Sequence, residues 1–362
     1  MFRCPKSVCH FVIAVLAGGW SGEADAASSS LCAQAGAIVG PLACVETAHG
    51  VALAGDAARA RQLGDLAEAG AGRFMASFGQ RPAPYVIVEG ASALAPAEKM
   101  EALRNAGFPA ALPWLSETVF RQQQEQSIRR AVTAQLAGRP PELIEAAVQA
   151  GLAQIKPERR DSIERAAIPH ELGHMWFRIA YWPAASLDGN QHYGGPSPDW
   201  LDEMAAVLME APDMFDQRLK QFSERYAGWR ANPDVADANV KLLLDIGNFF
   251  AEEHPAAAPV KTLLAARTAV EKQGTVMMLT GEEASKIADG SVRFYQQSAM
   301  VSRYLAERSG DPKVLNNIAQ AFARGETMAQ WLANAEPKGA LPRDLKAVQA
   351  DWLAWLAKRF PS

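Results

Sequence analysis

From about Thr118 to the C-terminus, apolar residues recur at helical spacing in one segment after another. Such spacing is typical of amphipathic helices, and glycine and proline mark the turns between them. The turn signals in this part of the chain lie at 138–141, 156–157, 189–198, Gly274 and 310–312. A chain with this pattern buries its apolar residues by packing helix against helix. The larger part of the fold is therefore expected to be α-helical.

The first third of the chain has a different pattern, which predicts strands. Residues 84–89 (PYVIVE) are rich in β-branched and aromatic side chains and precede Gly90. Residues 48–55 (AHGVALAG) predict a second, shorter strand. Asp56 can then cap a helix that extends to about Phe78. The N-terminal part is thus expected to mix strands with helices.

The two patterns together predict an α+β fold that is predominantly α-helical. The chain has 362 residues, enough for two compact lobes or one large domain. Hydrophobic residues make up 49% of it, an ordinary share for a protein with a buried core. We expect a small N-terminal α/β lobe of residues 27–117 and a helical domain of residues 118–362.

The first 26 residues have the order of features found in a secretory signal peptide. Arg3 and Lys6 supply a short basic region, residues 11–17 are apolar, and Ala24-Asp25-Ala26 is a small-x-small cleavage site. The alternative is an ordinary first helix. We expect cleavage near Ala26 and export to the periplasm or the medium.

The cysteines fit an exported protein. Cys4 and Cys9 would leave with the signal peptide, so the mature chain keeps Cys32 and Cys44. An even pair in an oxidising compartment favours a disulfide, although free thiols stay an alternative. Because no Cys-x-x-Cys occurs, a thiolate zinc site is not supported.

Charge and hydropathy exclude two classes of protein. The formal net charge is −4, so no basic excess is available to neutralise nucleic-acid phosphates. The mean hydropathy is −0.10, and no late apolar run has the length of a membrane span. We therefore expect neither a nucleic-acid partner nor a membrane span.

A five-residue motif, HELGH, begins at His170, within the helical pattern of residues 159–178. In a helix, His170 and His174 lie on one face a turn apart, so both imidazoles can bind one metal ion. Glu171 is one step round the helix, where its carboxylate can act as general base on a water bound to that ion. Pro169 has no N–H to donate, so the helix is expected to kink or to begin there.

A catalytic zinc site needs a third protein ligand. Phe177 and Ala180 stand where a metzincin has its glycine and third histidine, which excludes that class. A helix with an acidic first turn is predicted at 198–206 (PDWLDEMAA) and can supply a carboxylate. It follows a long loop, residues 185–198, in which His192 is the competing ligand, a substrate contact or a solvated residue.

HELGH followed by WLDEMAA resembles the gluzincin zinc peptidases, in particular the peptidase MA-like branch related to thermolysin-like and aminopeptidase-type catalytic domains. The resemblance covers about residues 160–360. It implies a thermolysin-like catalytic domain with one Zn²⁺ per chain. The implied ligands are His170, His174 and Glu203. It also implies that Tyr295, in FYQQSAMVSRYL, helps hold the oxyanion while Glu171 acts as the base.

Two positions depart from the family pattern. Met204 stands where the family has a glycine, and Val207 stands where an acid often holds a ligand histidine. Asp202 and Glu210 are the candidates to replace that acid. The absence of a G-x-M-E-N segment favours an endopeptidase over an aminopeptidase.

The expected function is therefore an exported zinc metallopeptidase that acts on peptide or protein substrates. The departures leave an alternative, a metal-bearing but non-hydrolytic protein that binds a peptide or an envelope partner on the same scaffold. The substrate and the oligomeric state stay open.

Several other residues have simpler interpretations. Asp199 and Asp202 are expected to stabilise a helix N-terminus, with Asp202 a possible partner of a ligand histidine. His254, which precedes a proline, is interpreted as a residue without a functional role, and Tyr304 as a packing residue. The tryptophans expected in the core are Trp331, Trp352 and Trp355.

Overall fold

The computed structural model of the chain describes residues 30–90, 96–154, 158–184, 196–235, 238–257, 281–334 and 339–361. Within these ranges most residues are helical and the strands form one four-stranded sheet, which confirms the expected α+β fold with a predominance of helix. None of the helices described there is both long and apolar enough to cross a membrane. The expected signal peptide lies outside the described ranges.

The strands follow the order β1-β2-β3-β4 across the sheet. β1 (Ala43–Glu46) pairs antiparallel with β2 (Gly50–Ala54), whereas β2, β3 (Tyr85–Gly90) and β4 (Ala110–Leu115) are parallel. β2 and β3 lie at the two predicted positions. β1 and β4 were not predicted from the sequence. Both are edge strands. Pro113 is tolerated in β4 because one side of an edge strand forms no hydrogen bonds to a neighbouring strand, so the missing N–H of proline costs nothing there.

The register divides the sheet between two layers of helices. Val86 of β3 lies opposite Val51 and Ala111, and all three face a small apolar cluster that includes residues of α1 and α3. Ile87, the next residue, faces the main core together with α2 (Ala57–Phe78), which has the predicted bounds and N-cap. The helices on the first face are α1, Leu31–Val39, and α3, Ala97–Asn105.

A disulfide joins the first helix to the sheet. Cys32 at the start of α1 is bonded to Cys44 of β1, with an S–S distance of 2.01 Å. The bonded alternative for this pair is thereby confirmed. The cross-link fixes α1 over the small apolar cluster, where both cysteines pack.

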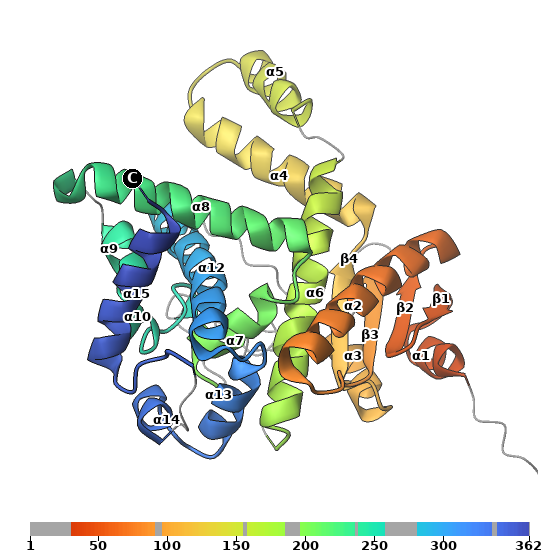
Figure 1. Cartoon of the computed structure of the whole chain (residues 1–362). Helices are drawn as coiled ribbons and strands as arrows, with labels where there is room; N and C mark the ends of the chain where they lie inside the picture. Colours follow the sequence, from red (N-terminus) through yellow and green to blue (C-terminus); the bar gives the residue numbers. More distant parts are fainter. Residues whose placement is uncertain are drawn as a thin grey trace, which may run out of the picture.

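The remaining helices form the larger part of the molecule (Figure 1). α4 and α5 pack on each other and project from the rest of the structure as a hairpin (Figure 1). Labelled as in Figure 1, these helices are α4 Glu117–Gln135, α5 Pro141–Leu152, α6 Glu158–Tyr181, α7 Asp199–Val207, α8 Pro212–Ala231, a 3-10 turn Pro233–Val235, α9 Ala238–Leu244, α10 Ile246–Phe249, α12 Gly281–Ser309, α13 Val314–Ala323, α14 Met328–Asn334 and α15 Leu345–Arg359.

Helix α6 lies between the sheet and the helical body. It packs against α2 and β4 on one side and against α7 on the other (Figure 1). The main hydrophobic core contains Ile87 of the sheet, Trp176 of α6 and Trp352 of α15. One continuous core therefore holds the sheet, α6 and the helical body together.

Helix α6 continues through Pro169 and does not begin there. The missing N–H of Pro169 leaves the carbonyl of Arg165, four residues earlier, without its helical donor. The N–H of Ala211, shortly after α7, donates to this carbonyl at 3.2 Å. The proline thus creates an attachment point for the segment that follows α7.

A buried ion cluster fastens α6 to the sheet. Arg59 of α2 donates to Glu164 of α6 at 2.8 Å and to Glu89 at the end of β3 at 2.9 Å. Arg160 adds a bond to Glu164 at 2.8 Å. Burial raises the pKa of Glu164, but the bonds from Arg59 and Trp114 outweigh burial and hold that pKa below its usual range. The ionised cluster fixes α6 relative to β3 at a point just before His170.

Candidate metal centre

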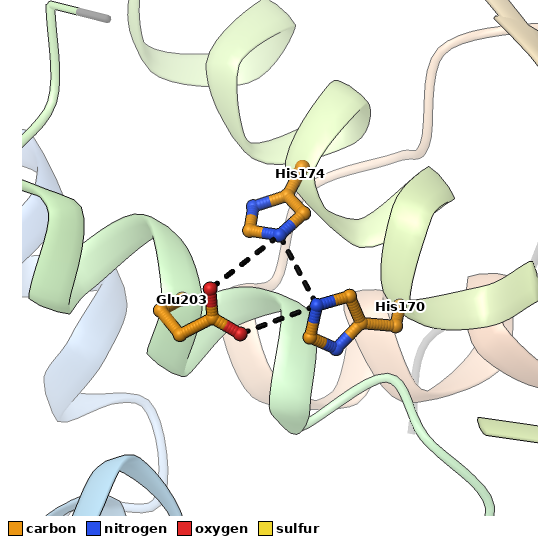
Figure 2. A group of neighbouring side chains, drawn as sticks. All are labelled: His170, His174 and Glu203. Atoms are coloured by element: carbon orange, nitrogen blue, oxygen red, sulfur yellow. Dashed lines mark hydrogen bonds and ion pairs between the residues drawn. The ribbon is translucent and has the colours of Figure 1, made fainter. Parts of the chain in front are cut away.

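Helix α6 presents His170 and His174 one turn apart toward α7 (Figure 2). Both imidazoles are buried, and their Nε2 atoms are 3.2 Å apart. Gly173 lets α7 come close, because a Cβ there would lie 3.0 Å from Cα of Ala206 and 2.8 Å from Cγ of Met209. The glycine of the motif is therefore required for the approach of the two helices.

Helix α7 places Glu203 opposite the two imidazoles. Oε1 of Glu203 is 3.2 Å from Nε2 of His170, and Oε2 is 3.8 Å from Nε2 of His174. Each of the three residues offers one ligand atom, and these atoms all lie within 4.8 Å of one another. Figure 2 shows the three side chains pointing toward one another from two helices. This buried group can hold a metal ion.

A second set of carboxylates orients the imidazoles. Oε1 of Glu210 lies 3.0 Å from Nδ1 of His170, and Oδ2 of Asp202 lies 3.1 Å from Nδ1 of His174. Arg218 of α8 donates from Nε and Nη2 to the two oxygens of Glu210 at 2.6 and 2.5 Å. Ligand histidines ordinarily have such partners, which fix the ring and direct the Nε2 lone pair at the metal. Both candidates for the missing acid are thus in contact with a histidine.

The charge of the group fits a divalent cation. In the described part of the chain, three buried carboxylates contact the imidazoles, Asp202, Glu203 and Glu210, and Arg218 pairs with one of them. A divalent ion with neutral imidazoles would balance the other two negative charges. If both rings donate from Nδ1 to the carboxylates, their Nε2 lone pairs face each other at 3.2 Å. When both rings are neutral, one divalent cation could accept both lone pairs.

The same carboxylates and imidazoles shift one another's pKa values when no metal is bound. Burial lowers the pKa of His170, but the charge of Glu203 and the hydrogen bonds that the ring donates to Glu203 and Glu210 outweigh burial and raise it to about 10. Burial raises the pKa of Glu203, yet the neighbouring histidines lower it to about 2. Without a metal, the group therefore holds a proton on His170 beside an ionised Glu203. A metal bound by this group would displace that proton.

The ring of Tyr295 lies at this group, and Glu171 is the neighbour of His170 in the chain. The ring of Tyr295, on α12, has its centre 5.7 Å from that of His170, and the guanidinium of Arg218 lies 4.8 Å from the centre of the tyrosine ring. Both Tyr295 and Glu171 are half-buried. Glu171 directly follows His170 on α6. The structure therefore brings the ring of Tyr295 close to the expected metal ligands.

His254, interpreted from the sequence as a residue without a functional role, lies beside this group. The structure buries its side chain and sets Nε2 3.9 Å from Oε2 of Glu203. Its backbone N–H donates to Oδ2 of Asp199, at the first position of α7, at 2.8 Å. His254 is far from HELGH in the sequence and belongs to no local motif, so only the folded chain reveals the contact.

The other interpretations have mixed outcomes. His192 lies outside the described residues. Tyr304 is buried and donates to Oδ2 of Asp351 at 2.9 Å, as a packing residue with a satisfied hydroxyl. Trp331 and Trp352 are buried in the core as expected, whereas Trp355 is only half-buried at its edge.

The substitution Gly173→Ala is expected to weaken metal binding by roughly tenfold or more. The added Cβ must displace Met209 and the main chain at Ala206, which moves Glu203 away from the imidazoles. A competition assay with a chromophoric zinc chelator measures the effect. Gly72→Ala on α2 is the control, since a Cβ there meets nothing within 4 Å and alanine favours helix. Equal zinc affinity in both variants would contradict the role given to Gly173.

No protein-family model, curated protein sequence or solved structure matches the chain.

Proposed function

We propose that the chain is an exported zinc metallopeptidase of the gluzincin type. The observation that carries the proposal is the buried convergence of His170 and His174 from α6 with Glu203 from α7, within the motif order HExxH followed by a downstream glutamate. The disulfide between Cys32 and Cys44 supports the export part, because disulfides persist in oxidising compartments.

The donor set and the motif together favour zinc. Two imidazoles and one carboxylate, with a further position open, are a known ligand set of catalytic zinc. The same donors also suit non-haem Fe(II). Glu171 favours zinc hydrolysis, since an acid directly after the first histidine is placed to act as a base and not as a ligand.

The chemistry divides between the ion and the side chains. Zinc held by these ligands would supply a Lewis acid and lower the pKa of a bound water to about 7. Glu171 would take a proton from the attacking water and pass it to the leaving amine. The hydroxyl of Tyr295 would donate to the oxygen that becomes negative as the peptide carbonyl is attacked. Asp202 and Glu210 hold the imidazoles in the tautomer that this arrangement needs.

Purification without chelators, followed by metal analysis and a peptide assay, tests the proposal. We expect about one zinc per chain and cleavage of a broad peptide library, abolished by a chelator and restored by added zinc. Cleavage of peptides blocked at both ends would assign an endopeptidase. A chain that holds zinc but cleaves no peptide would overturn the peptidase and support the alternative, a non-hydrolytic metal-bearing binding protein.

A further inference from the structure

The turn between α7 and α8 carries Glu210, the carboxylate that faces His170. This turn, residues 208–211, is called the Glu210 turn below; α7 ends before it and α8 begins after it. Because Glu210 lies outside both helices, neither helix alone determines where its carboxylate points. Contacts to other parts of the molecule must hold the turn for Oε1 of Glu210 to stay 3.0 Å from Nδ1 of His170.

Two main-chain groups of the Glu210 turn are bonded to other helices. The carbonyl of Met209 accepts hydrogen bonds from Nε of Arg73 in α2, at 2.8 Å, and from Nη2 of the same guanidinium. The N–H of Ala211 donates to the carbonyl of Arg165 in α6 at 3.2 Å. These bonds lie on either side of Glu210 in the chain, so together they fix the main chain that carries its side chain.

The bond from Ala211 to α6 exists because of Pro169. In a regular helix the carbonyl of Arg165 would accept the N–H of residue 169, but a proline has no N–H to donate. An alanine at this position would supply that N–H and compete with Ala211 for the same carbonyl. The proline therefore removes one hydrogen bond from α6 and makes its acceptor available to the Glu210 turn.

Helix α2 comes close to the same place because Gly70 has no side chain. A Cβ at Gly70 would lie 2.8 Å from Cβ of Pro169. Arg73 is three residues further along α2, so it lies on the same face of the helix. One face of α2 thus meets Pro169 and also supplies the guanidinium that binds Met209.

We propose that Pro169 and Arg73 are positioning residues for the metal centre, which hold the Glu210 turn between α6 and α2 so that Glu210 orients His170 for metal binding. Neither residue acts as a ligand, since proline has no donor atom in its side chain and a guanidinium stays protonated. This inference rests on the metal binding proposed above, but not on peptide cleavage.

Zinc affinity, measured by competition with a chromophoric chelator, tests both positions. Pro169→Ala restores the helical N–H, and Arg73→Met removes the donors while it keeps an unbranched stem. Loss of a partner behind a ligand costs about 10- to 100-fold in metal affinity, so we expect each variant to bind zinc roughly tenfold more weakly. Arg73→Lys keeps the charge and a donor, and it should recover part of the affinity.

Two control variants make the same chemical changes away from the Glu210 turn. Pro141→Ala lies at the exposed first position of α5, and Arg61→Met lies at an exposed position of α2. Both should bind zinc as the natural chain does. Because alanine is a better helix former than proline, Pro169→Ala should keep or raise the melting temperature of the metal-free protein. A loss of zinc affinity in this variant is then separate from a loss of stability.

The proton on Nδ1 of His170 reports its contact with Glu210 directly. In the Co²⁺-substituted protein, the ring N–H of a ligand histidine gives a paramagnetically shifted NMR signal that exchanges with solvent. The signal that changes in Glu210→Gln belongs to His170. We expect this signal to exchange faster in Pro169→Ala and in Arg73→Met. The signal of His174, which has its own carboxylate partner, should stay unchanged.

A double variant shows whether the effect passes through Glu210. In a Glu210→Gln background, Pro169→Ala should change zinc affinity by less than about threefold, because the contact that it disturbs is already altered. An undiminished loss in that background would overturn the inference. Unchanged zinc affinity in a folded Pro169→Ala would overturn it as well. If Arg73→Met does not fold, Pro169→Ala and its double variant give the decision.

Failure of this inference can be told apart from failure of the proposed function. Zinc binding that weakens as expected in the variants, without any peptide cleavage by the natural chain, would refute the peptidase and leave the inference standing. Peptide cleavage by a zinc-loaded natural chain, with equal zinc affinity in all variants, would do the reverse.

Discussion

The substitution Glu171→Gln is expected to abolish peptide hydrolysis while the metal stays bound. Glutamine has nearly the same shape as glutamate but cannot accept the proton of the attacking water at neutral pH. The ligand group of His170, His174 and Glu203 is unchanged by the substitution. A positioned general base contributes about 10²- to 10⁴-fold to a rate, so kcat/KM should fall by at least that range.

Three measurements on one preparation test this expectation. They are zinc content, thermal stability with and without zinc, and initial rates on the best peptide found in the library. Glu142→Gln, at an exposed position of α5, makes the same chemical change away from the site and should leave all three unaltered. Full activity in Glu171→Gln would remove the general-base assignment, and loss of zinc would mean that Glu171 helps to hold the metal.

The substitution Glu203→Gln is expected to cause the largest loss of metal affinity. The amide is a weaker ligand than the carboxylate, and it removes the negative charge that lies 3.2 Å from Nε2 of His170. Loss of a partner behind a ligand costs about 10- to 100-fold in metal affinity, and loss of the ligand itself should exceed that range. Glu210→Gln, which alters only the partner of His170, therefore provides a graded comparison.

Competition with a zinc chelator gives both dissociation constants, and zinc should raise the melting temperature of the natural chain more than that of Glu203→Gln. The expected order of zinc affinity is the natural chain, then Glu210→Gln, then Glu203→Gln. Glu203→Gln with the affinity of the natural chain would show that the metal is held elsewhere. If both variants bound zinc equally well, Glu203 would contribute no more to zinc affinity than Glu210 does.

The elements that carry the site could be predicted because their signals are local. The helical spacing around HELGH and the acidic helix start before Glu203 are each contained within one segment, and α6 and α7 form there. The motif also fixes which face of α6 must meet a partner. β3 was predictable for the same reason, since its apolar run ends at Gly90.

Other features depend on contacts that no short segment records. β4 contains alanines and Pro113, which are weak strand signals, and it forms because β3 offers a free edge. His254 reaches Glu203 only through the fold of the loop after α10. Arg218 was not singled out from the sequence, because Glu210 lies in the turn before α8 and the pairing depends on how that turn folds against the helix. Such contacts depend on tertiary packing and cannot be read from local sequence patterns.

The central position of α6 has an evolutionary consequence. Core residues of the sheet and α2 pack against one side of this helix, and core residues of the helical body pack against the other side. The residues at each of these two contacts must therefore fit one another. In a chimera that joined the first half of one such protein to the second half of another, core side chains from two different proteins would have to pack together. Recombination between the halves should therefore be poorly tolerated, and the two halves should change together over generations.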